Sequence, residues 1–316
     1  MAAVLPATRK SYLARWADFL LWWRLQKKGR AQKEPQNPHL DRAVCEWMDH
    51  EYLSGEQAER GSRMIAVVRH LRPAFSRGGT LKTPLALQAL QGWRRRAPGR
   101  MRTPLPYEVV CLIALRLLEG GSERLALMVM VMFAAYLRPS EAAGLQPRHL
   151  VAPLPGTRYH CWSLVIHPFE EGRGSKTNEH DEAIVLSAEY LRFLDGPLAR
   201  LKHASAPGPL FGVTQLEASR RFSLAARGAG LEVLEPEFYQ LRHSGPSFEM
   251  LTGMRSLQEI KLRGRWHSDR SVPRYQKEGR VAEQLGRLAP PVRAAALAAP
   301  PALAAALARP SALSGC

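Results

Sequence analysis

RLALMVMVMFAAYLRPSEAAGL, residues 124–145, is the stretch of sequence that decides the fold. As far as Leu137 it is apolar on nearly every face, which predicts a helix buried at the centre of a domain. Arg138 follows where that helix ends, so its guanidinium would be held rigidly and could offer a two-pronged fork to phosphate, with Glu141 behind it. Taken alone, this pair is more typical of a helix-terminal salt bridge.

The residues on either side extend the helical pattern around one small β segment. Helix-entry signals open residues 103–120, and helical patterns return from 187 to 288. Between them, residues 160–168 and 182–186 are predicted as strands on either side of a polar, turn-rich loop. We therefore expect a mainly α domain with a small β-hairpin over residues 103–287.

The first ninety-two residues (1–92) have the pattern of a separate helical bundle. Tyr12, Trp16, Phe19, Leu20 and Trp23 repeat at helical spacing and form one apolar face. Two further helices are predicted through residues 43–53 and 55–72. A small all-α domain is the simplest architecture for such a run.

Two segments differ in composition from these domains. Residues 93–102 (WRRRAPGRMR) are basic and interrupted by Pro and Gly, so we expect a linker that binds phosphate, although a solvated helix end would have the same composition. Residues 288–316 are rich in Ala and Pro, and we expect a tail that is disordered or partly helical. The candidate DNA-binding residues of the linker are Arg94, Arg95, Arg96, Arg100 and Arg102.

The charge of the chain points to a polyanionic partner. Lys and Arg number 45 against 28 acidic residues, a formal net charge of +17, and nucleic acid is the usual partner of such a protein. A generically basic protein would show the same balance. The 4 cysteines lack C-x-x-C spacing, which favours reduced thiols over disulfides or a zinc site. With no secretory or membrane-spanning segment apparent, we expect a soluble intracellular protein.

Three more positions could carry chemistry, each with an ordinary alternative. Lys176 lies in the loop between the predicted strands, where most lysines are simply solvated. Arg242 and His243 follow a predicted helix entry, and such a histidine is more often part of the core. Tyr275 follows Trp266 near the end of the domain and would by itself be a half-buried tyrosine. No phosphate-binding Gly-x-x-x-x-Gly-Lys loop and no acidic metal cluster accompany them, so we expect neither cofactor nor metal.

Taken together, four segments resemble the catalytic domain of the tyrosine recombinases, the integrases of phages and mobile elements. YLRPSEAAGL (136–145) resembles the first arginine box, and GSKTNEHDEAIVL (174–186) the β-hairpin lysine segment. YQLRHS (239–244) resembles the second arginine box, and RGRWHSDRSVPRYQK (263–277) the closing box, in a form closest to eukaryotic mobile-element members. The helical N-terminal region resembles the core-binding (SAM-like) domain that precedes the catalytic domain in this family.

The resemblance implies a metal-free cleavage and rejoining of DNA. Tyr275 would attack a scissile phosphate and form a phosphotyrosyl bond, while Arg138 and Arg242 hold the nonbridging oxygens. Lys176 would protonate the departing sugar oxygen, and Trp266 would donate its indole N–H to the phosphate. The implied partner is duplex DNA clamped between the two domains, with assembly into dimers and tetramers. The implied location is the nucleus.

The second arginine box and the closing box depart from the family pattern. Tyr239 stands where the family has a histidine, and a tyrosine is a poor proton carrier near neutral pH. Its expected role is therefore a supporting one, as it is for Glu141 and His243. Pro246 and Pro273 lie close to Arg242 and Tyr275, where proline could distort a helix. A catalytically inactive DNA-binding relative therefore remains an alternative. A type IB topoisomerase-like activity, which shares the tyrosine chemistry, is another.

Overall fold

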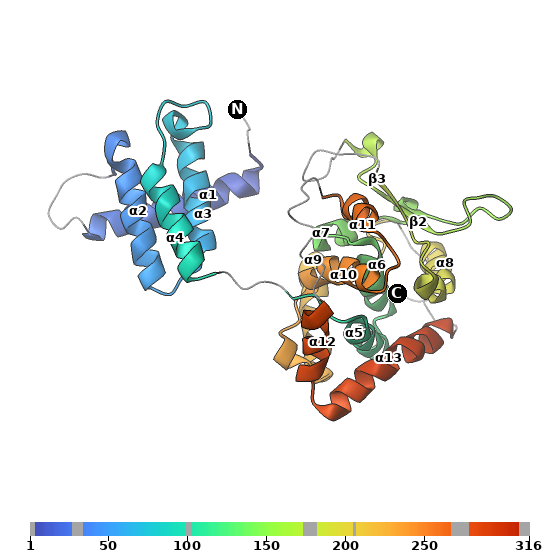
Figure 1. The fold of residues 1–316 in the computed structure, drawn as a ribbon. Helices are drawn as coiled ribbons and strands as arrows, with labels where there is room; N and C mark the ends of the chain where they lie inside the picture. The colour runs from blue at the N-terminus through green and yellow to red at the C-terminus, as the bar shows by residue number, and fades with distance from the viewer. Residues whose placement is uncertain are drawn as a thin grey trace. The chain divides into compact units, whose positions relative to one another are not determined.

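A computed structural model shows two compact units, Met1–Met101 and Arg102–Cys316, each with its own hydrophobic core (Figure 1). The protein is mainly α, with one small antiparallel sheet in the second unit, as the sequence predicts. The structure describes residues 4–26, 34–98, 103–172, 182–204, 207–266 and 278–309.

Within its described residues, the first unit is a bundle of four helices. The aromatic face of the first helix turns inward, where Phe19 and Trp23 are buried with Trp47 and Trp93. The last helix is fixed at its start by Asp41, whose carboxylate accepts the amide N–H groups that open its first turn, at 2.9–3.0 Å. The helices are α1 (Pro6–Gln26), α2 (Asn37–Leu53), α3 (Ala58–Leu71) and α4 (Pro84–Arg96), with a 3₁₀ turn, η1 (Pro73–Phe75), before α4.

The linker predicted for residues 93–102 does not begin at residue 93. Residues 93–96 form the last turn of α4, because the Trp93 ring is buried in the core of the first unit and keeps the helix going. Arg94, Arg95 and Arg96 are exposed on this turn, and Arg94 donates to the Ser62 hydroxyl at 2.8 Å. These three arginines therefore lie on an exposed helix end, and their contact with DNA stays a prediction.

The second unit is built around α6 (Glu123–Ala135), in which every residue except Arg124 is buried. This confirms the central helix predicted from its uniformly apolar sequence. Helices α5, α8 and α10 pack against it. The remaining α-helices are α5 (Tyr107–Glu119), α7 (Pro139–Gly144), α8 (Asp195–Ala204), α9 (Gln215–Gly228), α10 (Leu241–Leu251), α11 (Leu257–Gly264), α12 (Glu278–Arg287) and α13 (Pro290–Ala308). Short 3₁₀ turns are η2 (Pro147–His149), η3 (Phe169–Glu171), η4 (Glu189–Leu194), η5 (Glu232–Leu234) and η6 (Phe238–Gln240).

The two predicted strands form a hairpin, to which a short strand adds at one edge. The order is β1 (Leu150–Val151), β2 (Ser163–Ile166) and β3 (Glu182–Val185), all antiparallel. Leu164 of β2 pairs with Ile184 of β3, and both side chains are buried, so one face of the sheet covers the core. The alternation of buried and exposed positions is the reason that the strands are visible in the sequence.

Of the two expectations for the Ala/Pro-rich segment, disorder is wrong for Pro290–Ala308, which form helix α13. Helix α13 lies along α5 and buries Ala296, Ala299, Leu303 and Leu307 (Figure 1). These residues recur every three or four positions, and the alanines are small enough to let the two helices approach closely. By length and composition α13 would pass for a membrane span, a test that core helices of soluble proteins also pass.

Candidate functional site: an arginine cluster around Glu141

The site begins at a tight turn between α6 and α7. Tyr136 ends α6 in the left-handed conformation (φ 52°), which costs a non-glycine residue about 1–3 kcal/mol. The surrounding structure compensates, since the Tyr136 ring stacks on Trp266 with centroids 6.1 Å apart. The turn places Arg138 at the N-cap of α7, directly beside the buried core.

A buried carboxylate anchors the Tyr136 side chain. Glu249 is fully buried and accepts hydrogen bonds from the Tyr136 hydroxyl (2.5 Å), the Tyr190 hydroxyl (2.8 Å) and Arg255 Nε (2.5 Å). Burial, followed by the charge of Glu249, raises the pKa of both tyrosines, so they remain protonated donors. The network fixes the turn that carries Arg138.

Glu141 is the centre of the site. Its side chain is only 4% exposed, and it accepts from the Arg138 backbone N–H at 2.8 Å and from the Arg138 guanidinium. Glu141 thus caps the Arg138 amide at the start of α7 and also pairs with the Arg138 side chain, which explains why Arg138 and Glu141 occur together in the sequence.

Arg242 reaches the same carboxylate from α10. Its side chain is 2% exposed, and its Nη1 lies 3.7 Å from Glu141 Oε2. It also donates to the carbonyl oxygens of Tyr136 and, at 2.8 Å, of Gly264, and its guanidinium lies 5.4 Å from the centre of the Trp266 ring. Burial and then the nearby charge of Arg138 lower the pKa of Arg242 to about 10.

A third arginine, which sequence reasoning missed, completes the cluster. Arg265 ends α11 in the left-handed conformation (φ 56°), and its Nη2 donates to Glu141 Oε2 at 2.7 Å. The preceding residue must be glycine, because a Cβ on Gly264 would lie 1.9 Å from the Trp266 ring. Only the presence of an arginine inside the closing box hinted at this role.

The charge at this site is unbalanced. Three guanidinium groups contact the one carboxylate of Glu141, so positive charge remains in a largely buried place. Burial alone would raise the pKa of Glu141, but Arg265 and the Arg138 amide, then the other guanidiniums, outweigh it and hold that pKa below its usual range. Such an excess favours binding of an anion.

The helix that carries Arg242 passes very close to α6. A Cβ on Gly245 would lie 1.9 Å from the Phe133 carbonyl oxygen, so only glycine fits at this crossing. Pro246 follows inside α10, yet the helix continues to Leu251. Pro246 therefore does not end helix α10.

Tyr239 and His243 lie together at the start of α10. Their ring centroids are 5.5 Å apart and both side chains are half-buried. Tyr239 also acts electrostatically on Arg242, in the direction that raises the pKa of the arginine. This pair thus borders the arginine cluster.

The structure brings some of the site residues predicted from the sequence together, and others lie outside the described residues. Arg138, Glu141, Arg242 and Trp266 converge, with Arg265 in addition. Lys176, Tyr275, Pro273, Arg100 and Arg102 lie outside the described residues.

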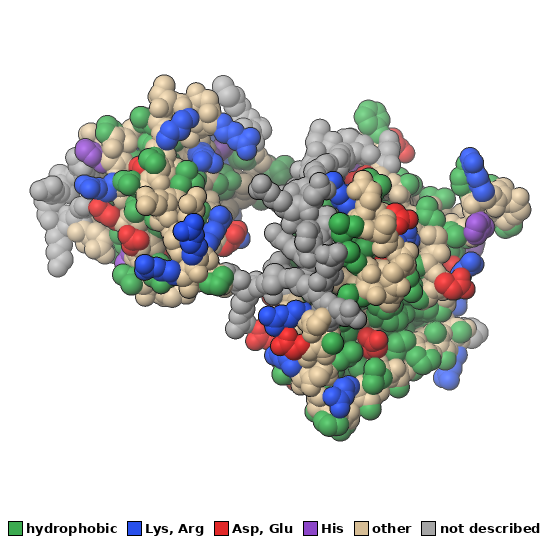
Figure 2. Space-filling model, in the orientation of Figure 1, with side chains coloured by type: hydrophobic (Ala, Val, Ile, Leu, Met, Phe, Trp, Pro, Cys, Tyr) green, Lys and Arg blue, Asp and Glu red, His purple; other side chains and the backbone are tan. Residues whose placement is uncertain are grey.

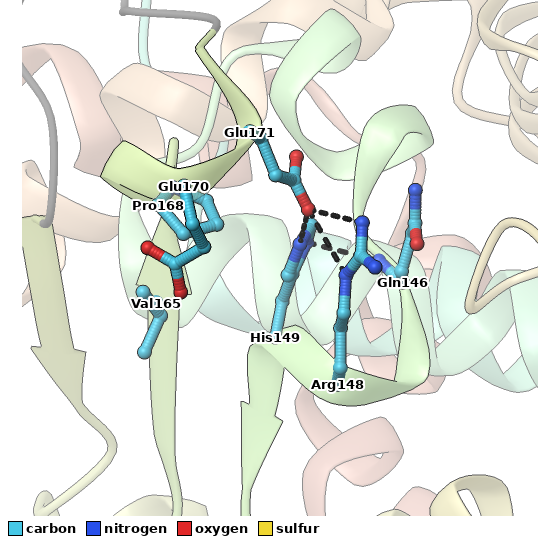
Figure 3. Close-up of a pocket in the computed structure, with 7 residues that line it drawn as sticks. All are labelled: Gln146, Arg148, His149, Val165, Pro168, Glu170 and Glu171. Carbon is cyan, nitrogen blue, oxygen red and sulfur yellow. Dashed lines mark hydrogen bonds and ion pairs between the residues drawn. The ribbon is translucent and has the colours of Figure 1, made fainter.

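A separate pocket of about 550 Å³ lies in the second unit, beside β2 (Figure 3). In it Glu171 accepts from His149 Nε2 at 2.7 Å and from Arg148 Nε at 3.0 Å. These contacts, chiefly the His149 hydrogen bond, lower the pKa of Glu171. None of the sequence-predicted site residues lines this pocket, and the described part of the chain holds no group of His, Cys, Asp and Glu suited to a metal ion.

Comparison with known proteins gives matches among solved structures alone. No protein-family model matches the chain, and no curated protein matches it. Among solved structures the chain is similar to the crystal structure of XerA recombinase, with a TM-score of 0.40 and 12% identity, over 88% of this chain and 98% of that chain.

Proposed function

We propose that this protein is a site-specific DNA recombinase of the tyrosine type, which cuts and rejoins DNA through a phosphotyrosyl intermediate. The observation that carries the proposal is the convergence of Arg138 and Arg242 on Glu141, with a surplus of positive charge around a single buried carboxylate. A phosphodiester is the anion that such a guanidinium pair fits best, because two forks can each hold a nonbridging oxygen.

The reaction would exchange one phosphate ester for another. The Tyr275 hydroxyl loses its proton to solvent as its oxygen forms a bond to phosphorus and the bond to the sugar oxygen breaks. Lys176 gives its own proton to that leaving oxygen. The arginines stabilise the charge that gathers on the nonbridging oxygens, and Trp266 adds its indole N–H. The phosphotyrosyl bond conserves the energy needed for rejoining.

Duplex DNA would also contact the first unit. Arg94, Arg95 and Arg96 are exposed at the C-terminal end of α4, and Figure 2 shows more basic than acidic side chains on the visible face of this unit. Arginines so placed bind phosphate without reading sequence, and such binding weakens steeply with salt. Assembly into dimers and tetramers on DNA, and action in the nucleus, belong to the same proposal.

A second candidate is a DNA-binding protein that no longer cleaves. It is favoured by Tyr239, which lies at the edge of the arginine cluster in the place where the resembled family has a histidine. The arginine cluster alone would then serve as a phosphate contact.

Covalent capture on DNA separates the two candidates. The protein is incubated with a library of randomised duplexes carrying nicks that trap the cleaved product, and adducts are detected after denaturation. The recombinase predicts an adduct that is absent with Tyr275→Phe and reduced roughly 10²- to 10³-fold with Arg138→Ala. Arg116→Gln, in an exposed pair with Glu119, is the control and should react like the wild type. DNA binding without any adduct would leave the second candidate.

A further inference from the structure

Arg265 joins two carboxylates that belong to different elements. Its Nη2 donates to Glu141 Oε2 of α7 at 2.7 Å, and its Nε lies 3.5 Å from Glu182 Oε2 of β3. The Arg265 side chain is 6% exposed and the Glu141 side chain 4%, so the pairing takes place largely away from solvent. Ion pairs in such a place constrain geometry far more than exposed ones, because leaving either charge unpaired is costly.

Arg263, two residues before Arg265, binds the other end of β3. Arg263 Nη1 donates to the Val185 carbonyl at 2.8 Å, and its Nε and Nη2 donate to the Ala134 carbonyl of α6 at 3.1 and 2.7 Å. Glu182 is the first residue of β3 and Val185 the last. The end of α11 therefore holds β3 at both ends.

The backbone at the end of α11 keeps this arrangement in place. Arg265 has left-handed geometry, and its amide N–H donates to the Leu262 carbonyl at 3.0 Å. Gly264, whose carbonyl accepts from Arg242, lies against the Trp266 ring. The segment that fixes β3 thus also contacts the second arginine of the cluster.

We propose that Arg265 is a positioning residue, which holds the start of β3 beside the arginine cluster through Glu182 and Glu141. The proposal rests on the proposed function, in which Lys176, just before β3 in the sequence, protonates the leaving oxygen. The positioning role runs through Glu141 and Glu182, because Nη2 and Nε of Arg265 face their carboxylate oxygens. Arg138, with a side chain that is 20% exposed, is the more accessible phosphate ligand.

Hydrogen exchange tests the bridge without requiring any activity. Arg265→Gln and Glu182→Gln should each speed amide exchange in residues 182–185 by about tenfold, with α2 unchanged, because the start of β3 loses its anchor. Arg265→Lys, which keeps the charge, should restore part of the protection. Unchanged exchange in β3 would overturn the proposal, as would an equal rise throughout the second unit.

A change of leaving group then tests the catalytic consequence. In a duplex whose bridging sugar oxygen is replaced by sulfur, the thiolate departs without needing a proton. A mispositioned proton donor should therefore slow cleavage of the ordinary duplex by roughly 10- to 100-fold in Arg265→Gln while the sulfur duplex reacts nearly as in the wild type. Arg138→Ala is the matched control, since loss of a phosphate ligand slows both substrates.

The outcomes separate failure of this inference from failure of the proposed function. Equal losses on the two substrates, or no loss, in Arg265→Gln would overturn the positioning role while leaving the recombinase intact. No adduct from the wild type on either substrate would overturn the recombinase itself, and with it the catalytic part of the positioning role.

Discussion

Arg138 and Arg242 meet at the two oxygens of one carboxylate. The guanidinium of Arg138 bonds Glu141 Oε1, and Nη1 of Arg242 lies 3.7 Å from Oε2, although the two arginines come from different helices. Because like charges repel, a buried guanidinium and a partly buried one remain this close only with a counter-ion between them. Glu141 is thus as necessary to the site as the arginines.

Removal of that counter-ion should destabilise the second unit. Glu141→Gln keeps the shape of the side chain but removes the carboxylate shared by Arg138 and Arg242 and leaves Arg265 with Glu182 alone. We expect a loss of about 3–5 kcal/mol in the free energy of unfolding. Urea denaturation measures it. Glu119→Gln, in an exposed pair with Arg116, is the control and should change stability by less than about 0.5 kcal/mol. A loss for Glu141→Gln no larger than that of the control would contradict the central role of this carboxylate.

The same carboxylate should make stability depend on acid. The folded-state pKa of Glu141 lies below its unfolded value of about 4.3, so its charge stabilises the folded state above that value. This contribution is lost as pH falls through the depressed folded pKa. The difference in unfolding free energy between wild type and Glu141→Gln should be constant near neutrality and shrink below about pH 4. A difference that stays constant down to pH 3 would rule this linkage out.

The crossing of α10 and α6 should tolerate no side chain at Gly245. A Cβ there would lie 1.9 Å from the Phe133 carbonyl oxygen, so Gly245→Ala must push α10 and Arg242 away from the cluster. We expect a loss of at least about 2 kcal/mol in unfolding free energy, measured in urea, together with loss of adduct formation. Gly286→Ala in α12, where nothing lies within 4 Å, should instead stabilise the protein by up to about 1 kcal/mol. Equal effects of the two substitutions would show that the close crossing is unimportant.

The packing of α13 on α5 should contribute measurably to stability. Leu303 is fully buried, and Leu303→Ala should cost about 2–5 kcal/mol in urea denaturation. Leu297 on the same helix is 56% exposed, and Leu297→Ala should cost less than about 0.5 kcal/mol. If the two substitutions had the same effect, α13 would not be docked as described.

Helices and strands whose sequence has a clear hydrophobic period could be predicted. Features that depend on contact with residues far away in the chain could not. The uniformly apolar residues 125–137 predicted α6, and alternation predicted β2 and β3, because in both cases the neighbours along the chain already show the buried face. The low-complexity composition of α13 hid its inward residues, and the charge of residues 93–96 hid the buried Trp93. Both errors arose because composition was given more weight than periodicity.

By itself the sequence determined the mainly α class, the central helix, the hairpin, and the identity and order of Arg138, Glu141 and Arg242 along the chain. Only the tertiary structure decided that these residues share one site, that Arg265 joins them, and that Glu182 binds Arg265. The physical reason is that helix and strand formation depend on neighbouring residues. An ion-pair cluster depends instead on which helix ends the folded core brings within a few ångströms of each other.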